Sequence, residues 1–110
     1  MELTKSSEGE VTTLKLAGEI DLHASPSLRS ELQTCARDKV PRLLLDFTDV
    51  EYIDSSGLAT LIEYLRAAGP HGGKIALFGL QEKVRTIFDL VRLGELFSIT
   101  ETRDQALASA

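Results

Sequence analysis

The sequence contains very few of the cysteine and histidine residues that form disulfides and metal sites. Its 110 residues include one cysteine and two histidines, so an internal disulfide and a Cys-rich zinc site are both excluded. Cys35 falls on the apolar side of a predicted helix, and we interpret it as a small core residue. His23 and His71 are isolated, without the convergent ligands that a metal site needs. We therefore predict two loop histidines, no metal and no other cofactor.

Basic residues and long apolar runs are also scarce. Lys and Arg number 12 against 17 Asp and Glu, which gives a formal net charge of -5, whereas nucleic-acid binders normally carry a basic patch. No apolar run approaches the roughly 18 residues that suggest a transmembrane helix. The first residues, Met1–Lys5, lack the charged-then-apolar order of a signal peptide. We expect a cytoplasmic protein that binds neither nucleic acid nor membrane.

Strand and helix patterns alternate along the chain. A hydrophobic fraction of 43% is enough for one core, and we predict a single domain over residues 1–110. The alternation indicates an α/β fold, with a mixed, mostly parallel sheet of four to five strands packed with about four helices. Strand-helix-strand units make the central strands parallel. An N-terminal hairpin, with strands at Leu3 and at 12–16 around a turn at 6–9, makes the sheet mixed.

The helices are predicted from their capping residues and apolar stripes. Ser25 is a preferred N-cap and Pro26 suits the first helical position, so a helix should run from there to Val40. A second helix follows Gly57 and ends at Gly69. Thr102 and Gln105 match a capping box that opens a short terminal helix. The first and third helices should bury the stripes Leu28, Leu32, Cys35, Ala36 and Val84, Ile87, Phe88, Val91.

Between the helices we predict further strands. Residues 43–47 are a nearly continuous apolar run, typical of an interior strand covered on both faces, and residues 48–53 should form a loop. Residues 75–78 are another apolar strand, and Ile99 marks a short last one. Leu93, Leu96 and Phe97 are expected to close the core. An exposed part of that cluster would favour weak homodimerisation.

The run Asp54-Ser55-Ser56-Gly57 lies where a strand gives way to a helix, the edge that holds functional loops in parallel sheets. One N-cap side chain is worth about 1 kcal/mol, and three successive capping residues exceed what the helix needs. Glycine in the first turn costs roughly 0.5–1 kcal/mol against alanine, which is explained if something approaches the backbone closely. The alternative is that Asp54 or Ser55 simply caps the helix and Gly57 relieves crowding against the sheet.

A phosphate would be tolerated at this position. A helix N-terminus offers free N–H groups and a partial charge of about +0.5, and phosphoserine brings about -1.5 to -2 charges. The helix end would partly neutralise the dianion. A partner docked over the same loop would instead meet its bulk and the repulsion of neighbouring acids. Phosphorylation could therefore abolish binding without unfolding the domain.

Three segments of the chain share a known arrangement. Residues 16–21 read Leu-Ala-Gly-Glu-Ile-Asp. Residues 44–47 read Leu-Leu-Asp-Phe and lead to Tyr-Ile-Asp-Ser-Ser-Gly-Leu at 52–58, while Val-Arg-Thr-Ile-Phe at 84–88 precedes Leu-Gly-Glu-Leu-Phe at 93–97. In order and spacing these segments resemble the STAS domains, specifically the small bacterial anti-sigma factor antagonists.

The resemblance implies a binding switch and not an enzyme. Such an antagonist binds an anti-sigma factor with serine kinase activity and so releases a sigma factor. The kinase inactivates it by phosphorylating the serine after the motif's aspartate, and a serine phosphatase restores it. That serine is Ser55, Asp54 is the motif's acid, and Asp21 matches the aspartate that the family places near the serine. Ser56 and Gly57 complete the motif, and His23 lies beside the predicted docking face.

Other functions remain open beside the switch. Ala17 stands where relatives often carry a hydroxyl residue, and residues 22–26 are specific to this chain, so the partner kinase is not identified. The serine pair could be only the helix cap of a STAS scaffold or transporter accessory subunit. Alternatively, the strand ends near Asp21 and Ser55 could hold a nucleotide or small molecule. A serine hydrolase is disfavoured, because the motif lacks the first glycine of Gly-x-Ser-x-Gly.

Overall fold

A five-stranded sheet lies at the centre of residues 1–109, the part of the chain that the computed structural model describes. Its strands follow one another in sequence order: β1 (Glu2–Glu8), β2 (Val11–Ile20), β3 (Arg42–Ile53), β4 (Lys74–Phe78) and β5 (Ser98–Thr100). β1 pairs antiparallel with β2, and every later pair is parallel. The prediction of a mixed, mostly parallel sheet is confirmed.

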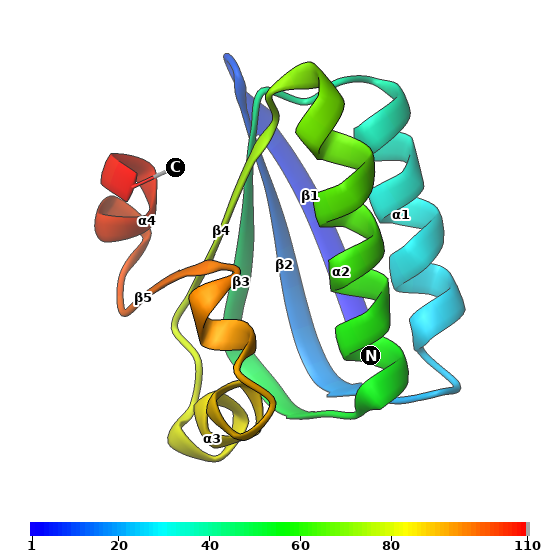
Figure 1. Cartoon of the computed structure of the whole chain (residues 1–110), viewed down its shortest axis with the longest axis vertical. Coiled ribbons are helices and arrows are strands. Elements are labelled where there is room, and N and C mark those ends of the chain that lie inside the picture. Colours follow the sequence, from blue (N-terminus) through cyan, green and yellow to red (C-terminus); the bar gives the residue numbers. More distant parts are fainter. Residues whose placement is uncertain (110) are drawn as a thin grey trace.

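The helices of the same residues cover the two faces of the sheet unequally. They are α1 (Ser25–Arg37), α2 (Ser55–Ala68), α3 (Glu82–Leu90) and α4 (Arg103–Ser109), with short 3₁₀ turns η1 (Gly69–His71) and η2 (Leu93–Glu95). Figure 1 shows α1 and α2 side by side on one face and α4 on the other. The main core packs under α1, α2 and α3, where Phe88 makes edge-to-face contacts with Phe47 and Phe97 at centroid distances of 6.1 and 6.2 Å.

On the second face of the sheet, α4 packs over β3, β4 and β5. A smaller cluster of Leu44, Ala76, Phe78 and Ala106 lies there, so the first half of β3 is buried on both faces, as predicted. The capping box is also confirmed. The Gln105 backbone N–H donates to Thr102 Oγ1 at 3.2 Å, and the Thr102 backbone N–H donates to Gln105 Oε1 at 3.3 Å.

The predicted loop at 48–53 is wrong, because β3 continues to Ile53 beside β2. The register between the two strands shifts twice, between Lys15 and Ala17 and between Gly18 and Glu19. At each shift β3 contributes one residue more than β2, which is the arrangement of a β-bulge. The buried residues of this half, Phe47, Val50 and Ile53, therefore recur every third residue. The strand could not be recognised from the sequence, because its apolar residues do not alternate with the usual period of two.

Three smaller predictions also need correction. The hairpin turn is not at 6–9, because β1 continues to Glu8 and the turn falls on Gly9 and Glu10, with Gly9 at φ 60°. The N-cap of α1 is Ala24 and not Ser25. Val91 does not join the core stripe, since it lies beyond the end of α3 and is 52% exposed.

The cluster after α3 is only partly buried. Leu93 and Phe97 pack into the core as predicted, but Leu96 is exposed, as are Leu90 and Val91. Weak homodimerisation through this surface stays a prediction. Within residues 1–109, no helix is both long and apolar enough to span a bilayer.

Candidate functional site

The candidate site lies where β2 and β3 end side by side. The last pair of these parallel strands is Ile20 with Ile53, so Asp21 and Asp54 leave the sheet next to each other. The backbone N–H of Asp54 donates to the carbonyl of Ile20 at 3.1 Å. Asp21 opens the turn into α1 and Asp54 opens α2, which brings two distant sequence segments together at this edge.

Asp54 is the N-cap of α2 and holds the site together. Its Oδ1 accepts from the backbone N–H groups of Ser56 and Gly57 at 2.9 and 3.2 Å and from Ser56 Oγ at 2.5 Å. Its Oδ2 accepts from the backbone N–H of Leu22 at 3.1 Å. One carboxylate thus caps α2 and fastens the loop that leads to α1.

These donors lower the pKa of the Asp54 carboxyl below its usual range. The hydrogen bond from the Ser56 hydroxyl is the largest cause. Desolvation opposes it, and the backbone N–H groups of Gly57, Ser56 and Leu22 add to the lowering. Because all these donors favour the charged form, the cap is a carboxylate at neutral pH.

A chain of hydroxyl contacts joins the two loops. Ser25 Oγ lies 2.8 Å from Ser56 Oγ and donates to the Asp21 carbonyl at 2.7 Å, while Ser56 Oγ donates to Asp54. Asp21 also caps its own turn, since its Oδ1 accepts from the Ala24 backbone N–H at 2.9 Å. Each hydroxyl has one proton, so the two serines cannot fill all three contacts at once.

Ser55 takes no part in this network. It is the first residue of α2 and is exposed, and no hydrogen bond within residues 1–109 engages its hydroxyl. Its two neighbours bond to each other in the cap, because the carboxylate of Asp54 accepts from the backbone N–H and from the hydroxyl of Ser56. Ser55 is therefore the more exposed hydroxyl of the motif, whereas Ser56 is half-buried and hydrogen-bonded to Asp54.

Gly57 is explained by packing against the sheet. A Cβ built on it would lie 2.7 Å from Ile53 Cγ1, 2.8 Å from Ile20 Cγ2 and 2.9 Å from the Ile20 carbonyl oxygen. Gly57 is itself buried. Of the two explanations that the sequence left open, the structure supports relief of crowding, and no external group is needed to account for this glycine.

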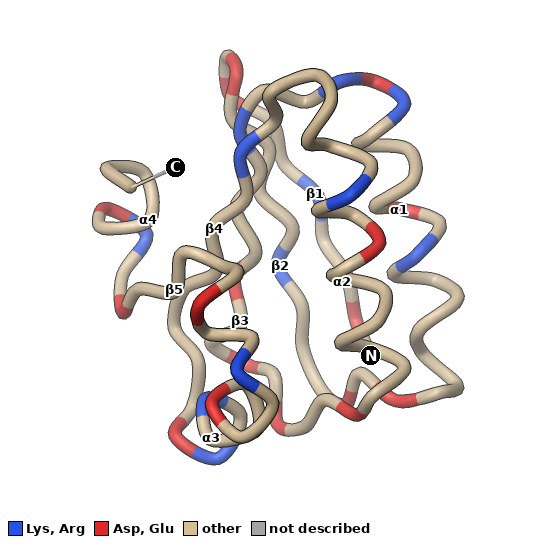
Figure 2. The backbone as a smooth tube through the Cα atoms, in the orientation of Figure 1, with Lys and Arg blue, Asp and Glu red and all other residues tan. Residues whose placement is uncertain are grey.

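The surroundings of Ser55 are acidic and partly apolar. The segments 18–28 and 48–57 contain no Lys or Arg, and Figure 2 shows acidic residues where β2 and β3 pass into α1 and α2. Leu22 is 75% exposed and Tyr52 is 45% exposed in these segments, and His23 is exposed beside Leu22. No group of acidic, histidine or cysteine residues within 1–109 is arranged to hold a metal.

Sequence reasoning missed Ser25, Leu22 and Tyr52. Ser25 was predicted as a helix cap, whereas its hydroxyl reaches across to Ser56, 31 residues away along the chain. No local pattern signals such a contact. The exposed Leu22 did carry a signal, since it is a large apolar residue in an otherwise polar segment.

The sheet topology, with a capped serine motif at the start of α2, is that of one small α/β domain class. The STAS domain family model matches residues 3–106, and the chain belongs to that family. Among its relatives is the anti-sigma-B factor antagonist of Bacillus subtilis, which is 30% identical over 96 residues, covering 87% of this chain and 86% of the relative. By this likeness the present chain is a member of the anti-sigma factor antagonist family.

Solved structures agree on the fold. An anti-sigma factor antagonist from Mycobacterium paratuberculosis superimposes with a TM-score of 0.89 at 25% identity, covering 98% of this chain and 92% of that one. The Bacillus cell fate determinant SpoIIAA in its phosphorylated form gives a TM-score of 0.76 at 21% identity, with 97% of each chain covered. The predicted fold and family are both confirmed.

Proposed function

We propose that this chain is a non-enzymatic binding switch that phosphorylation at Ser55 turns off. In its unmodified form it binds an anti-sigma factor with serine kinase activity and so releases a sigma factor. The kinase modifies Ser55, and a serine phosphatase restores the active form. Such a cycle consumes ATP, which assigns the protein to the cytoplasm.

One observation carries this proposal: Ser55 alone in its motif has a free, exposed hydroxyl. A kinase needs a hydroxyl that can enter its active site, and the hydroxyl of Ser56 is engaged by Asp54 at 2.5 Å. Modification of Ser55 breaks no hydrogen bond of the cap. The fold should therefore accept the phosphate with little loss of stability.

We expect the helix end to neutralise an added phosphate less than the sequence suggested. Asp54 already occupies the backbone N–H groups of Ser56 and Gly57, so these donors are not available to a phosphate on Ser55. The new dianion, of about -1.5 to -2 charges, therefore faces outward. Leu22 and Tyr52 present apolar surface nearby, and a phosphate placed in an apolar interface disrupts it through desolvation.

The relatives support the same cycle. The Bacillus subtilis relative is named an anti-sigma-B factor antagonist, and SpoIIAA was solved in a phosphorylated form. Asp21, Asp54, Ser56 and Gly57 would support the phosphosite by holding the two loops together, and His23 would lie within the bound surface.

Ser27 provides a matched control for the phosphosite test. It is an exposed serine in the first turn of α1, at the same edge of the sheet. We expect anti-sigma factor kinases of the host, given ATP, to phosphorylate the wild type and Ser27→Ala but not Ser55→Ala, as read by mass spectrometry. Phosphate on Ser55→Ala at the wild-type level would contradict the proposal.

Binding provides the second test. Titration calorimetry with the same kinases should show Ser55→Asp binding more than about tenfold weaker than wild type, because a charge buried in an interface without a partner costs several kcal/mol. Ser27→Asp should bind nearly as wild type does. Equal affinity of Ser55→Asp and wild type would overturn the switch while leaving the family assignment intact.

A further inference from the structure

A groove runs between α1 and α2, away from the phosphosite motif. It encloses about 310 Å³ and is lined by both helices, through Arg29, Leu32, Gln33, Ala36, Thr60, Glu63, Tyr64 and Ala67. This volume lies at the lower end of the range for small-molecule sites, roughly 300–1,000 Å³. Arg29 and Ala36 are seven residues apart on one helix, so the groove is about 10 Å long.

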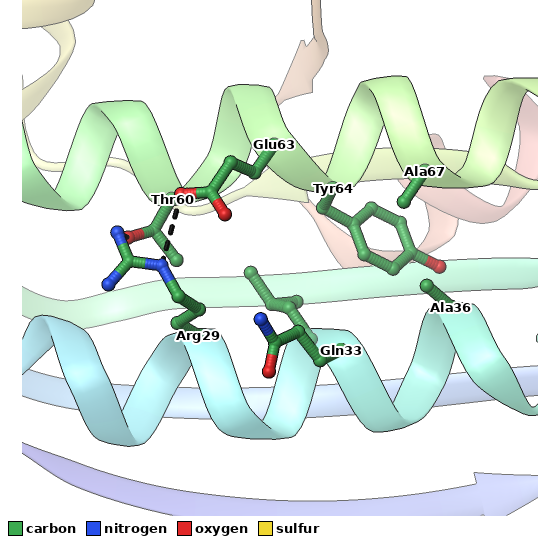
Figure 3. Close-up of a pocket in the computed structure, with 8 residues that line it drawn as sticks. Arg29, Gln33, Ala36, Thr60, Glu63, Tyr64 and Ala67 are labelled. Carbon is green, nitrogen blue, oxygen red and sulfur yellow. Dashed lines mark hydrogen bonds and ion pairs between the residues drawn. The ribbon is translucent and has the colours of Figure 1, made fainter.

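Tyr64 supplies the polar feature that points to a ligand. The residue is only 2% exposed, and its buried hydroxyl has no hydrogen-bond partner in the described part of the chain. Figure 3 shows its ring across the groove and its hydroxyl directed between Ala36 and Ala67. A buried hydroxyl is normally hydrogen-bonded, so this hydroxyl is a donor that lacks an acceptor within the described residues.

The opposite end of the groove carries balanced charge. Arg29 Nε donates to Glu63 Oε2 at 3.0 Å, and Arg29 Nη2 donates to Thr60 Oγ1 at 3.3 Å. Since Glu63 already balances Arg29, this end does not call for an anion. Between the two ends the walls are mostly apolar, formed by Leu32, Ala36, Ala67 and the Tyr64 ring, and the Gln33 side chain is the one polar group among them.

We propose that the groove binds a neutral small molecule with an apolar ring and a carbonyl acceptor, and that the acceptor takes the hydrogen bond of the Tyr64 hydroxyl. Small side chains flank that hydroxyl, so a slight separation of α1 and α2 there admits the carbonyl. Burial raises the pKa of Tyr64 to about 12, which keeps the hydroxyl protonated and able to donate. The proposal does not depend on phosphorylation of Ser55.

A ligand in this groove would act on the helices that form the phosphosite. Their first turns meet through Ser25 and Ser56, and Thr60 in the groove wall donates to the Ser56 carbonyl at 2.9 Å. Binding of a small molecule in the groove could therefore change the distance between the two loops.

Acetophenone and isopropylbenzene make a suitable pair of probes, because they share their shape and differ in the carbonyl. In amide-detected NMR titrations, acetophenone should shift signals of residues 29–36 and 60–67. Wild type should bind it about tenfold more tightly than isopropylbenzene, the value of one hydrogen bond to a buried donor. Tyr64→Phe should remove that preference. Equal affinities in wild type, or shifts confined to other residues, would overturn the proposal.

One further variant and one stability measurement complete the test. Ala67→Leu extends an exposed helical residue into the groove and should weaken both probes at unchanged fold. Tyr64→Phe should melt at or a few degrees above the wild-type temperature, because it removes an unpaired buried hydroxyl. A fall of several degrees would show that the hydroxyl is already satisfied in the free protein, and would count against the site.

Discussion

Replacing Gly57 by alanine tests how tightly α2 packs on the sheet. Alanine has the higher helix propensity, worth about 0.5–1 kcal/mol, so on local grounds the variant should be more stable. The added Cβ, however, would lie 2.7–2.9 Å from Ile53, from Ile20 and from the Ile20 carbonyl. The carbonyl belongs to the strand backbone and cannot rotate away. Overpacking of this kind costs typically 1–3 kcal/mol.

The clash should therefore exceed the propensity gain. We expect Gly57→Ala to lose about 1–2 kcal/mol and its melting temperature to fall by roughly 5–15 °C. Thermal unfolding followed by circular dichroism measures this directly. Gly94→Ala is the control, because its Cβ would meet only Asp89 Oδ1, at 3.2 Å, on an exposed side chain that can move. It should stay within about 0.5 kcal/mol of wild type. If Gly57→Ala proves as stable as that control, the packing argument is refuted.

Two further predictions concern the cap of α2. The folded pKa of Asp54 lies below its unfolded value. Its contribution to the free energy of unfolding is therefore complete above about pH 4 and is lost as the pH falls through the folded pKa. Urea unfolding of Asp54→Asn at a series of pH values should show a shallower loss of stability in acid than unfolding of the wild type. A double-mutant cycle of Ser25→Ala and Ser56→Ala should give a coupling of about 0.5–1.5 kcal/mol. A coupling near zero would mean that the contact between the Ser25 and Ser56 hydroxyls contributes nothing to the stability of the fold.

The elements that could be predicted from sequence are those with local signals. The apolar run at 43–47, the hairpin and the capping box of Thr102 with Gln105 each depend on residues that are close together in the chain. The position of the serine motif at the carboxyl end of a strand was also predictable, because parallel sheets collect their functional loops there.

What could not be predicted depends on tertiary contacts. The two bulges of β3 exist only in its pairing with β2, and they change the period of the strand from two to three. The hydroxyl of Ser25 finds its partner on another loop, so its residue type predicted a cap that Ala24 forms instead. The choice between the two explanations of Gly57 likewise needed the positions of Ile20 and Ile53.

The extended half of β3 also limits which changes in chain length the protein can accept. A residue deleted or inserted between Phe47 and Asp54 would turn Val50 and Ile53 out of the core and aim the serine motif in a new direction. Chain length at the other edge, where η1 leads to β4, is free of that constraint, since Gly69 and Gly72 have open space around them. Reporter peptides and affinity tags are therefore best inserted in the turn at 69–72, before the crowded Gly73.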